Sequence, residues 1–145
     1  MTLWIVLLLL ACVLSPLAWL IPSRAQRGQM DVRLRARRMG LAMQLSRQEW
    51  PHWLETKPPS ACAQYHLGRR RGQVDSWCYW QVEPGRWLNR WREPCAEASL
   101  AEQLARLPAD VFKVEATPQM VALCWGERGQ GDALQSVCDF LRARA

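Results

Sequence analysis

Cysteine is the residue type with the most chemical potential in this chain of 145 residues, which contains six of them. Cys12 lies within an apolar N-terminal run, and an odd number follows it: Cys62, Cys78, Cys95, Cys124 and Cys138. An exported domain favours an even number because its cysteines pair, whereas a cytoplasmic domain keeps its thiols reduced. No CxxC motif occurs, and Cys62 with His66 has no second close pair to complete a zinc site. We therefore interpret the five as small buried residues, and we expect no metal and no cofactor.

Motifs typical of catalysis are missing from the sequence. His52 and His66 are the only histidines, no serine has a nucleophile-elbow motif around it, and no HExxH motif occurs. The glycine-rich residues 126–131 lack the lysine and the spacing of a phosphate-binding loop, and we expect a connecting loop there. We therefore expect no enzymatic activity, although a site assembled from residues distant in sequence would leave no motif.

Tryptophan and arginine are unusually abundant, with nine tryptophans and seventeen arginines among the nineteen basic residues. Aromatic rings beside guanidinium groups bind single-stranded nucleic acid, but the same composition suits a protein interface or the core of a small domain. Trp77 and Trp80 fall on opposite faces of a predicted strand, which disfavours a shared platform for nucleic acid. The candidate partner surface consists of Trp50, Trp53, Trp87 and Trp91.

The N-terminal residues 3–21 carry no charge. As a helix they cover roughly 28 Å, close to the thickness of a bilayer core, and Trp4 and Trp19 lie near the ends, where aromatic rings prefer the interface. We expect residues 1–22 to form a transmembrane anchor. A cleaved signal peptide and a lipoprotein acylated at Cys12 are the alternatives, but a positively charged start is missing.

A basic stretch follows the apolar run and predicts its orientation. Because arginines collect on the cytoplasmic side of a span, we expect the N-terminus outside, residues 23–145 in the cytoplasm and the protein in a bacterial inner membrane. Six arginines at that surface also attract anionic lipid, each by about 1 kcal/mol. The predicted lipid contacts are Arg24, Arg27, Arg33, Arg35, Arg37 and Arg38.

The remaining pattern predicts an α+β fold. We expect a basic juxtamembrane helix over residues 23–40, ended by Gly40, and then a soluble domain over residues 41–145. Strands are expected at 41–45, 61–67, 76–82, 87–91, 111–116 and 120–125, and helices are expected after the Ser99-x-x-Glu102 capping box and after Asp132. Residues 61–67 and 76–82 have the pattern of a hairpin. Because strands come in runs, a small antiparallel sheet with two or three helices is predicted.

One resemblance concerns the layout of the first thirty or so residues. The end of the apolar run, Leu17-Ala18-Trp19-Leu20-Ile21-Pro22, leads directly into Ser23-Arg24-Ala25-Gln26-Arg27. This order resembles the YajC-type accessory proteins of the bacterial preprotein translocase, which have one N-terminal span followed by a proline and a basic helix. The soluble part of that family is shorter and rich in strands, so the resemblance implies the topology and transfers no functional residue.

These observations together predict a non-enzymatic single-span membrane protein whose cytoplasmic domain binds or positions a protein partner. The alternatives are an exported, disulfide-containing periplasmic domain and a membrane-tethered nucleic-acid binder. We disfavour nucleic acid and expect anionic lipid and an unidentified protein as partners.

Overall fold

The computed structural model of the chain describes residues 1–20, 24–55, 57–128 and 132–145. It divides into two compact units, Met1–Asp31 and Val32–Ala145. The boundary falls inside helix α2 (Arg24–Arg38). The helix predicted over residues 23–40 is therefore present as α2, and Gly40, with a φ of 90°, stands just beyond its end.

The first unit contains helix α1 (Thr2–Leu20). It is uncharged, none of its residues is buried, and Pro16 lies within it. The helix is long and apolar enough to cross a membrane. A signal sequence at the N-terminus has the same length and composition.

The second unit is built on a six-stranded sheet in the order β1-β2-β6-β5-β3-β4, and every neighbouring pair is antiparallel. The predicted α+β class with an antiparallel sheet is therefore confirmed. The strands are β1 (Ala42–Arg47), β2 (Ala61–Gly68), β3 (Trp77–Glu83), β4 (Arg86–Leu88), β5 (Val111–Ala116) and β6 (Met120–Trp125). The two strands predicted at 111–116 and 120–125 are present as β5 and β6, and they pair with each other as a hairpin.

The predicted hairpin of residues 61–67 and 76–82 is wrong, because β2 pairs with β1 and β6. The segment after β2 turns toward the β5–β6 connection instead. The Arg69 amide donates to the carbonyl of Gln119, and the Arg69 guanidinium donates to the carbonyl of Thr117. Strand β3 forms its hairpin with β4 across Gly85, whose φ of 81° suits glycine.

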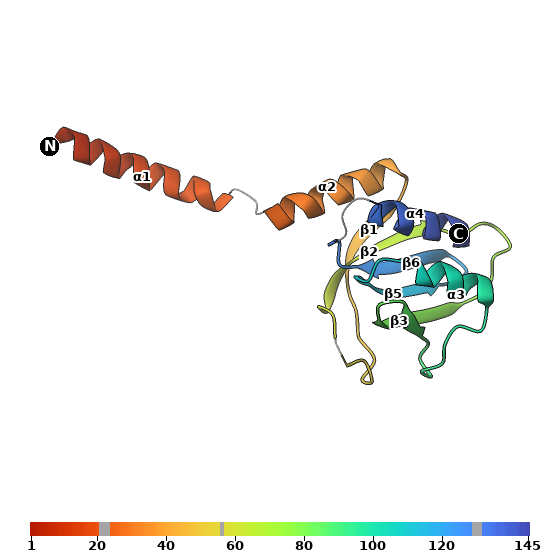
Figure 1. Cartoon of the computed structure of the whole chain (residues 1–145). Helices are drawn as coiled ribbons and strands as arrows, with labels where there is room; N and C mark the ends of the chain where they lie inside the picture. The colour runs from red at the N-terminus through yellow and green to blue at the C-terminus, as the bar shows by residue number, and fades with distance from the viewer. Residues whose placement is uncertain (21–23, 56, 129–131) are drawn as a thin grey trace. The chain divides into compact units, whose positions relative to one another are not determined.

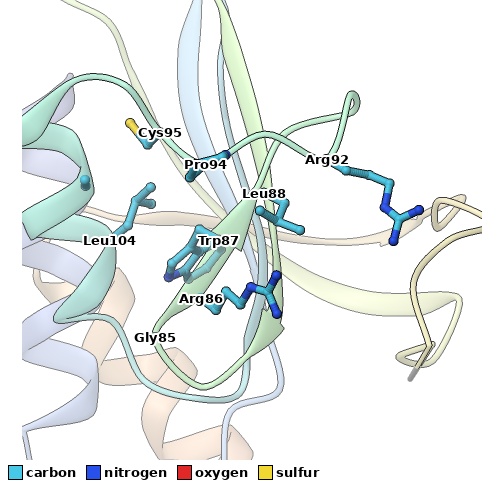
Figure 2. Close-up of a pocket in the computed structure, with 9 residues that line it drawn as sticks. Gly85, Arg86, Trp87, Leu88, Arg92, Pro94, Cys95 and Leu104 are labelled. Carbon is cyan, nitrogen blue, oxygen red and sulfur yellow. The ribbon is translucent and has the colours of Figure 1, made fainter.

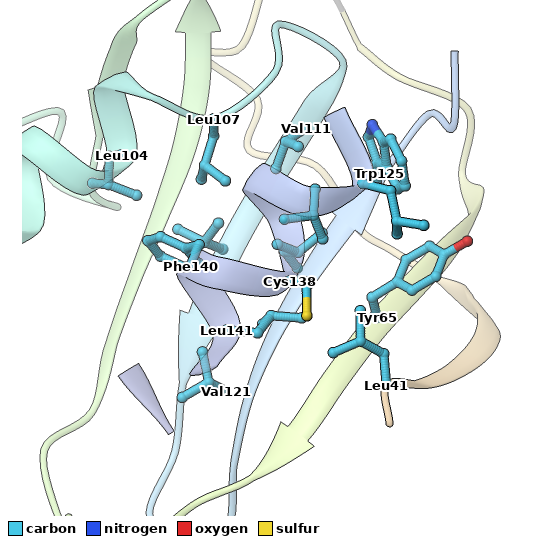
Figure 3. Close-up of a cluster of buried hydrophobic side chains, with 14 of the residues drawn as sticks. Leu41, Tyr65, Leu104, Leu107, Val111, Val121, Trp125, Cys138, Phe140 and Leu141 are labelled. Atoms are coloured by element: carbon cyan, nitrogen blue, oxygen red, sulfur yellow. The ribbon is translucent and has the colours of Figure 1, made fainter. Parts of the chain in front are cut away.

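Helices α3 (Ala98–Ala105) and α4 (Ala133–Arg144) pack on one face of the sheet (Figure 1). Figure 3 shows the resulting core, in which Trp125 and Val121 of β6 lie near Leu141 and Cys138 of α4. These side chains are at most 1 % exposed. Burying a large apolar side chain stabilises a fold by about 1.5–3 kcal/mol, so this helix-covered face supplies most of the stability.

The end of α2 belongs to the same core, since Ala36 and the nearby Leu41 are buried.

The predicted start of α3 at the Ser99 capping box is wrong: the helix begins at Ala98, and Ser99 lies inside it. The Ser99 hydroxyl instead accepts a hydrogen bond from Arg144 at the end of α4. Arg144 also pairs with Glu97, so the two covering helices are tied to each other.

Candidate functional site

The opposite face of the sheet is covered by no helix of the described part of this unit, and we call it the helix-free face. Its side chains follow from the alternation along the strands, which sends every second residue away from the core. They are mostly polar, sulfur-containing or small: Gln44, Ser46, Cys62, Gln64, His66, Cys78, Trp80, Lys113, Glu115, Ala122 and Cys124. This face therefore holds the groups that could do chemistry.

Polar side chains are linked across this face, strand by strand. The Gln44 amide donates to Gln64 at 2.9 Å, and the Gln64 amide donates to Glu115 at 3.5 Å. Glu115 lies 3.6 Å from the Lys113 ammonium, which donates to Gln48 at 3.1 Å. The chain of contacts satisfies these groups and joins β1, β2 and β5 with the loop that follows β1.

Two thiols lie beneath this polar layer. Cys62 and Cys124 are 7 % and 2 % exposed, and they stand on the neighbouring strands β2 and β6. The hydrogen bond that the Cys124 thiol donates lowers the pKa of Cys62, and the charge of Lys113 lowers it further. The same thiol hydrogen bond, followed by burial, raises the pKa of Cys124. By contrast, burial is the main cause that raises the pKa of Cys78 to about 12.

A stack of rings and cations continues this face toward β3. The Lys113 ammonium lies 5.8 Å from the Trp80 ring, Trp80 meets Trp53 edge-on at 6.0 Å, and the Arg92 guanidinium lies 5.9 Å from Trp53. Trp50 makes a separate edge contact with Phe112. The predicted surface residues Trp50 and Trp53 therefore hold the loop after β1 against the sheet, and both are half-buried.

The outer edge of β3 is open over residues 77–79. Strand β4 pairs with β3 only from Trp80 to Glu83, and the chain then turns away at Asn89. A hollow of about 460 Å³ lies beside this edge, which we call the β3-edge groove. Its wall contains Trp91, which is 64 % exposed, and the Arg90 guanidinium stacks 4.2 Å from that ring.

Trp87, another predicted surface residue, lies elsewhere. It is only 5 % exposed and belongs to the core, so it cannot form a partner surface without unfolding. A hollow of about 320 Å³ lies between β4 and α3. Figure 2 shows Trp87 on the side of Leu104, while the guanidinium groups of Arg86 and Arg92 extend away from that apolar side. We therefore remove Trp87 from the candidate surface and keep Trp91.

Arg33, one of the predicted lipid-contacting arginines, pairs with a buried carboxylate of the second unit. The Arg33 guanidinium donates two hydrogen bonds of 2.8 Å to the Glu127 carboxylate, whose side chain is 3 % exposed. The Tyr65 hydroxyl donates to the same carboxylate at 2.6 Å, and burial with this bond raises the pKa of Tyr65. The ion pair locks the second half of α2 to β2 and to the segment after β6.

The other predicted lipid contacts have different surroundings. Arg35, Arg37 and Arg38 are exposed in the second unit, and Arg27 is exposed in the first unit. Arg24 begins α2. Contact of these arginines with lipid stays a prediction.

Metal ligands do not gather in the described residues, where no group of three or more His, Cys, Asp and Glu lies close enough to hold an ion. Residues 129–131 of the glycine-rich stretch lie outside the described part of the chain. The Nδ1 atom of His66 is buried without a hydrogen-bond partner.

Comparisons of the chain with protein-family models, curated proteins and solved structures gave no match.

Proposed function

We propose that this protein is a single-span bacterial inner-membrane protein whose second unit binds an acidic, extended segment of a protein partner without catalysing a reaction. The observation that carries the proposal is the β3-edge groove. Its surroundings combine an open strand edge, an exposed ring and free positive charge in one place.

An open strand edge can bind a peptide through its unpaired backbone N–H and C=O groups. An extended peptide that lies along residues 77–79 gains main-chain hydrogen bonds, as in other cases of strand addition. It would continue the line of β4, which stops at Leu88. The space beside the edge is large enough for several side chains.

Trp91 and Arg90 give this edge its expected affinity. Tryptophan and arginine are the residue types most enriched among those that dominate binding energies. A ring that is 64 % exposed gains apolar burial only when something covers it. Its stacked arginine restricts the ring before binding, so less conformational entropy is lost on binding.

Charge favours an acidic partner. Arg86, Arg90 and Arg92 lie on β4 and the following turn, and all three are exposed. Arg90 lines the groove together with Glu115, and Arg86 and Arg92 line the neighbouring hollow between β4 and α3. Glu83 lies 3.9 Å from Arg86. Nucleic acid fits less well, because one exposed ring beside a strand edge provides no succession of stacking platforms.

The proposal places binding next to a membrane. Support comes from the length and composition of α1 and from the arginines that follow it, which favour a cytoplasmic second unit. The resemblance of the first residues to YajC-type proteins makes translocase complexes the first place to search for the partner. The exported domain remains the alternative.

Two matched substitutions test the groove. Arg90→Glu reverses a charge at the β3-edge groove, and Arg106→Glu reverses a charge on α3, where Arg106 pairs with Glu102. We expect Arg90→Glu to lower recovery of the partner from gently solubilised, nuclease-treated membranes at least tenfold, about 1.4 kcal/mol. Arg106→Glu should leave recovery unchanged. Equal recovery with both variants, or loss of the partner on nuclease treatment, would contradict the proposal.

A reporter fused after Ala145 tests the orientation separately. We expect a fluorescent protein to be active there and alkaline phosphatase to be inactive. The reverse result would favour the exported alternative.

A further inference from the structure

The two thiols of the helix-free face are brought together by strand register. Cys124 on β6 pairs with Gln64 on β2, and Cys62 stands two residues earlier on β2, so the two cysteines are diagonal neighbours on one face. Both side chains are buried on this face, so the register places two thiols beside each other on neighbouring strands.

A cation lies beside this pair. Lys113 on β5 stands directly opposite Cys124, and its side chain is 14 % exposed. Cysteines that react as thiolates are typically found next to a lysine, arginine or protonated histidine, whereas structural cysteines lie among apolar groups. Cys138, which is fully buried in the helix-covered core, illustrates the second kind.

The two sulfur atoms have different protonation preferences. The pKa of Cys62 is lowered, with the hydrogen bond from Cys124 as the largest cause, and the pKa of Cys124 is raised. Cys62 is also the more exposed of the two, 7 % against 2 %, and lies beyond the end of the β2–β6 pairing. A small peroxide therefore reaches the Cys62 sulfur first, and we assign the attack to Cys62.

The bond that such a pair would form requires a local movement of the backbone. A disulfide requires Cα atoms about 4.4–6.8 Å apart, and diagonal neighbours in a sheet are typically about 7–8 Å apart. The β2–β6 pairing ends at Ala63 and Trp125, so Cys62 lies just beyond it and is held only through Ser46 of β1. A local shift of Cys62 toward β6 breaks no β2–β6 pairing.

We propose that Cys62 and Cys124 form a two-cysteine redox site in which a small peroxide generates a reversible disulfide. The Cys62 thiolate attacks one peroxide oxygen, the O–O bond breaks, and Cys62 becomes a sulfenic acid as hydroxide leaves. The Cys124 sulfur then attacks the Cys62 sulfur, the S–O bond breaks, and the Cys124 proton leaves with hydroxide as water. In sum, two thiols and one hydrogen peroxide give one disulfide and two waters, and thiol exchange restores the pair. This site is independent of the proposed function.

Peptide mapping of the full chain tests the site directly. Membranes containing the protein are treated with hydrogen peroxide, free thiols are alkylated, and the digest is examined by mass spectrometry. We expect a peptide pair joined through Cys62 and Cys124, with Cys78, Cys95 and Cys138 alkylated. Absence of the joined pair at peroxide levels that oxidise exposed thiols would overturn the proposal.

Substitutions assign the two roles. Cys124→Ser should leave Cys62 as a sulfenic acid that reacts with a dimedone probe, whereas Cys62→Ser should abolish probe labelling. Lys113→Gln should slow oxidation of Cys62 several-fold, because the thiolate loses a neighbouring cation. The control Cys138→Ser should leave the joined pair unchanged. Equal labelling of the Cys62→Ser and Cys124→Ser variants would contradict the assignment.

Discussion

The two faces of the sheet in Val32–Ala145 differ in how they treat polar groups. On the helix-covered face, the Trp125 indole donates to Asp110 at 2.9 Å and the Tyr65 hydroxyl donates to Glu127. On the helix-free face, the Trp80 indole nitrogen and His66 Nδ1 are buried without partners. The Trp87 indole nitrogen in the helix-covered core is also buried without a partner. The two faces therefore differ mainly in composition: the first is mostly apolar, while the second carries linked amides, charges and thiols.

The side chains that stabilise the domain thus lie mainly on one face of the sheet, and most of the groups that could react or bind lie on the other. An unpaired buried polar atom costs about 1–3 kcal/mol, so a face sealed by helices consists mostly of apolar side chains. A face without helices keeps water close to its side chains, so amides, charges and thiols are tolerated there. The same division places the two thiols and the stack of rings and cations on the face without helices.

Substituting one side chain on each face tests the division with the largest expected effect. Leu141 is fully buried in α4, whereas Gln44 on the helix-free side of β1 is exposed and donates to Gln64. We expect Leu141→Ala to lower the free energy of unfolding by about 2–5 kcal/mol and Gln44→Ala to lower it by about 1 kcal/mol or less. Denaturant unfolding of the detergent-solubilised chain, followed by tryptophan fluorescence, measures both. Similar losses for the two variants would contradict the division.

Breaking the buried ion pair should have the next largest effect. Arg33→Met leaves the Glu127 carboxylate buried without its cation, and we expect a loss of about 2–3 kcal/mol. The double variant Arg33→Met/Glu127→Leu removes both charges and should recover most of that loss. Additive losses in the double variant would mean that the two side chains do not depend on each other.

The smallest predicted effect concerns Asp75, whose carboxylate accepts hydrogen bonds from Arg69 and from the Trp77 indole. The Arg69 bond lowers the pKa of Asp75 below its ordinary 3.8. The stabilisation is therefore present above that value and is lost as the pH falls through the lowered pKa. Because Asp75 is half-exposed, we expect Asp75→Asn to cost less than about 1 kcal/mol at pH 7. At about pH 2 the variant and the wild type should have converging stabilities, and a constant difference would contradict this origin.

Local patterns predicted much of the fold. The charge-free run predicted α1, the alternation predicted β2, β3, β5 and β6, and the i, i+4 spacings predicted α3 and α4. The strand order escaped prediction because the connection after β2 has good turn chemistry and gives no sign that Arg69 bonds to the β5–β6 turn. Pairing between distant strands depends on contacts that a local pattern does not contain.

The sequence distinguished the residues of the candidate site from buried structural residues only in part. Little in the local sequence distinguishes the buried Trp87 from the exposed Trp91, since an arginine directly precedes each of them. Arg33 looks like its neighbours in sequence because its partner Glu127 lies 94 residues away. The alternation did assign Cys62 to the face opposite Tyr65, but the register that adds Cys124 required the structure.

Site-specific photocross-linking in cells that produce the protein tests the account most directly. A benzophenone amino acid replaces either Trp91 at the β3-edge groove or Gln135, which is exposed on α4. We predict a cross-linked protein partner from position 91 and none from position 135. A partner captured from position 135 and not from position 91 would show that the helix-covered side meets the partner, which would contradict the account.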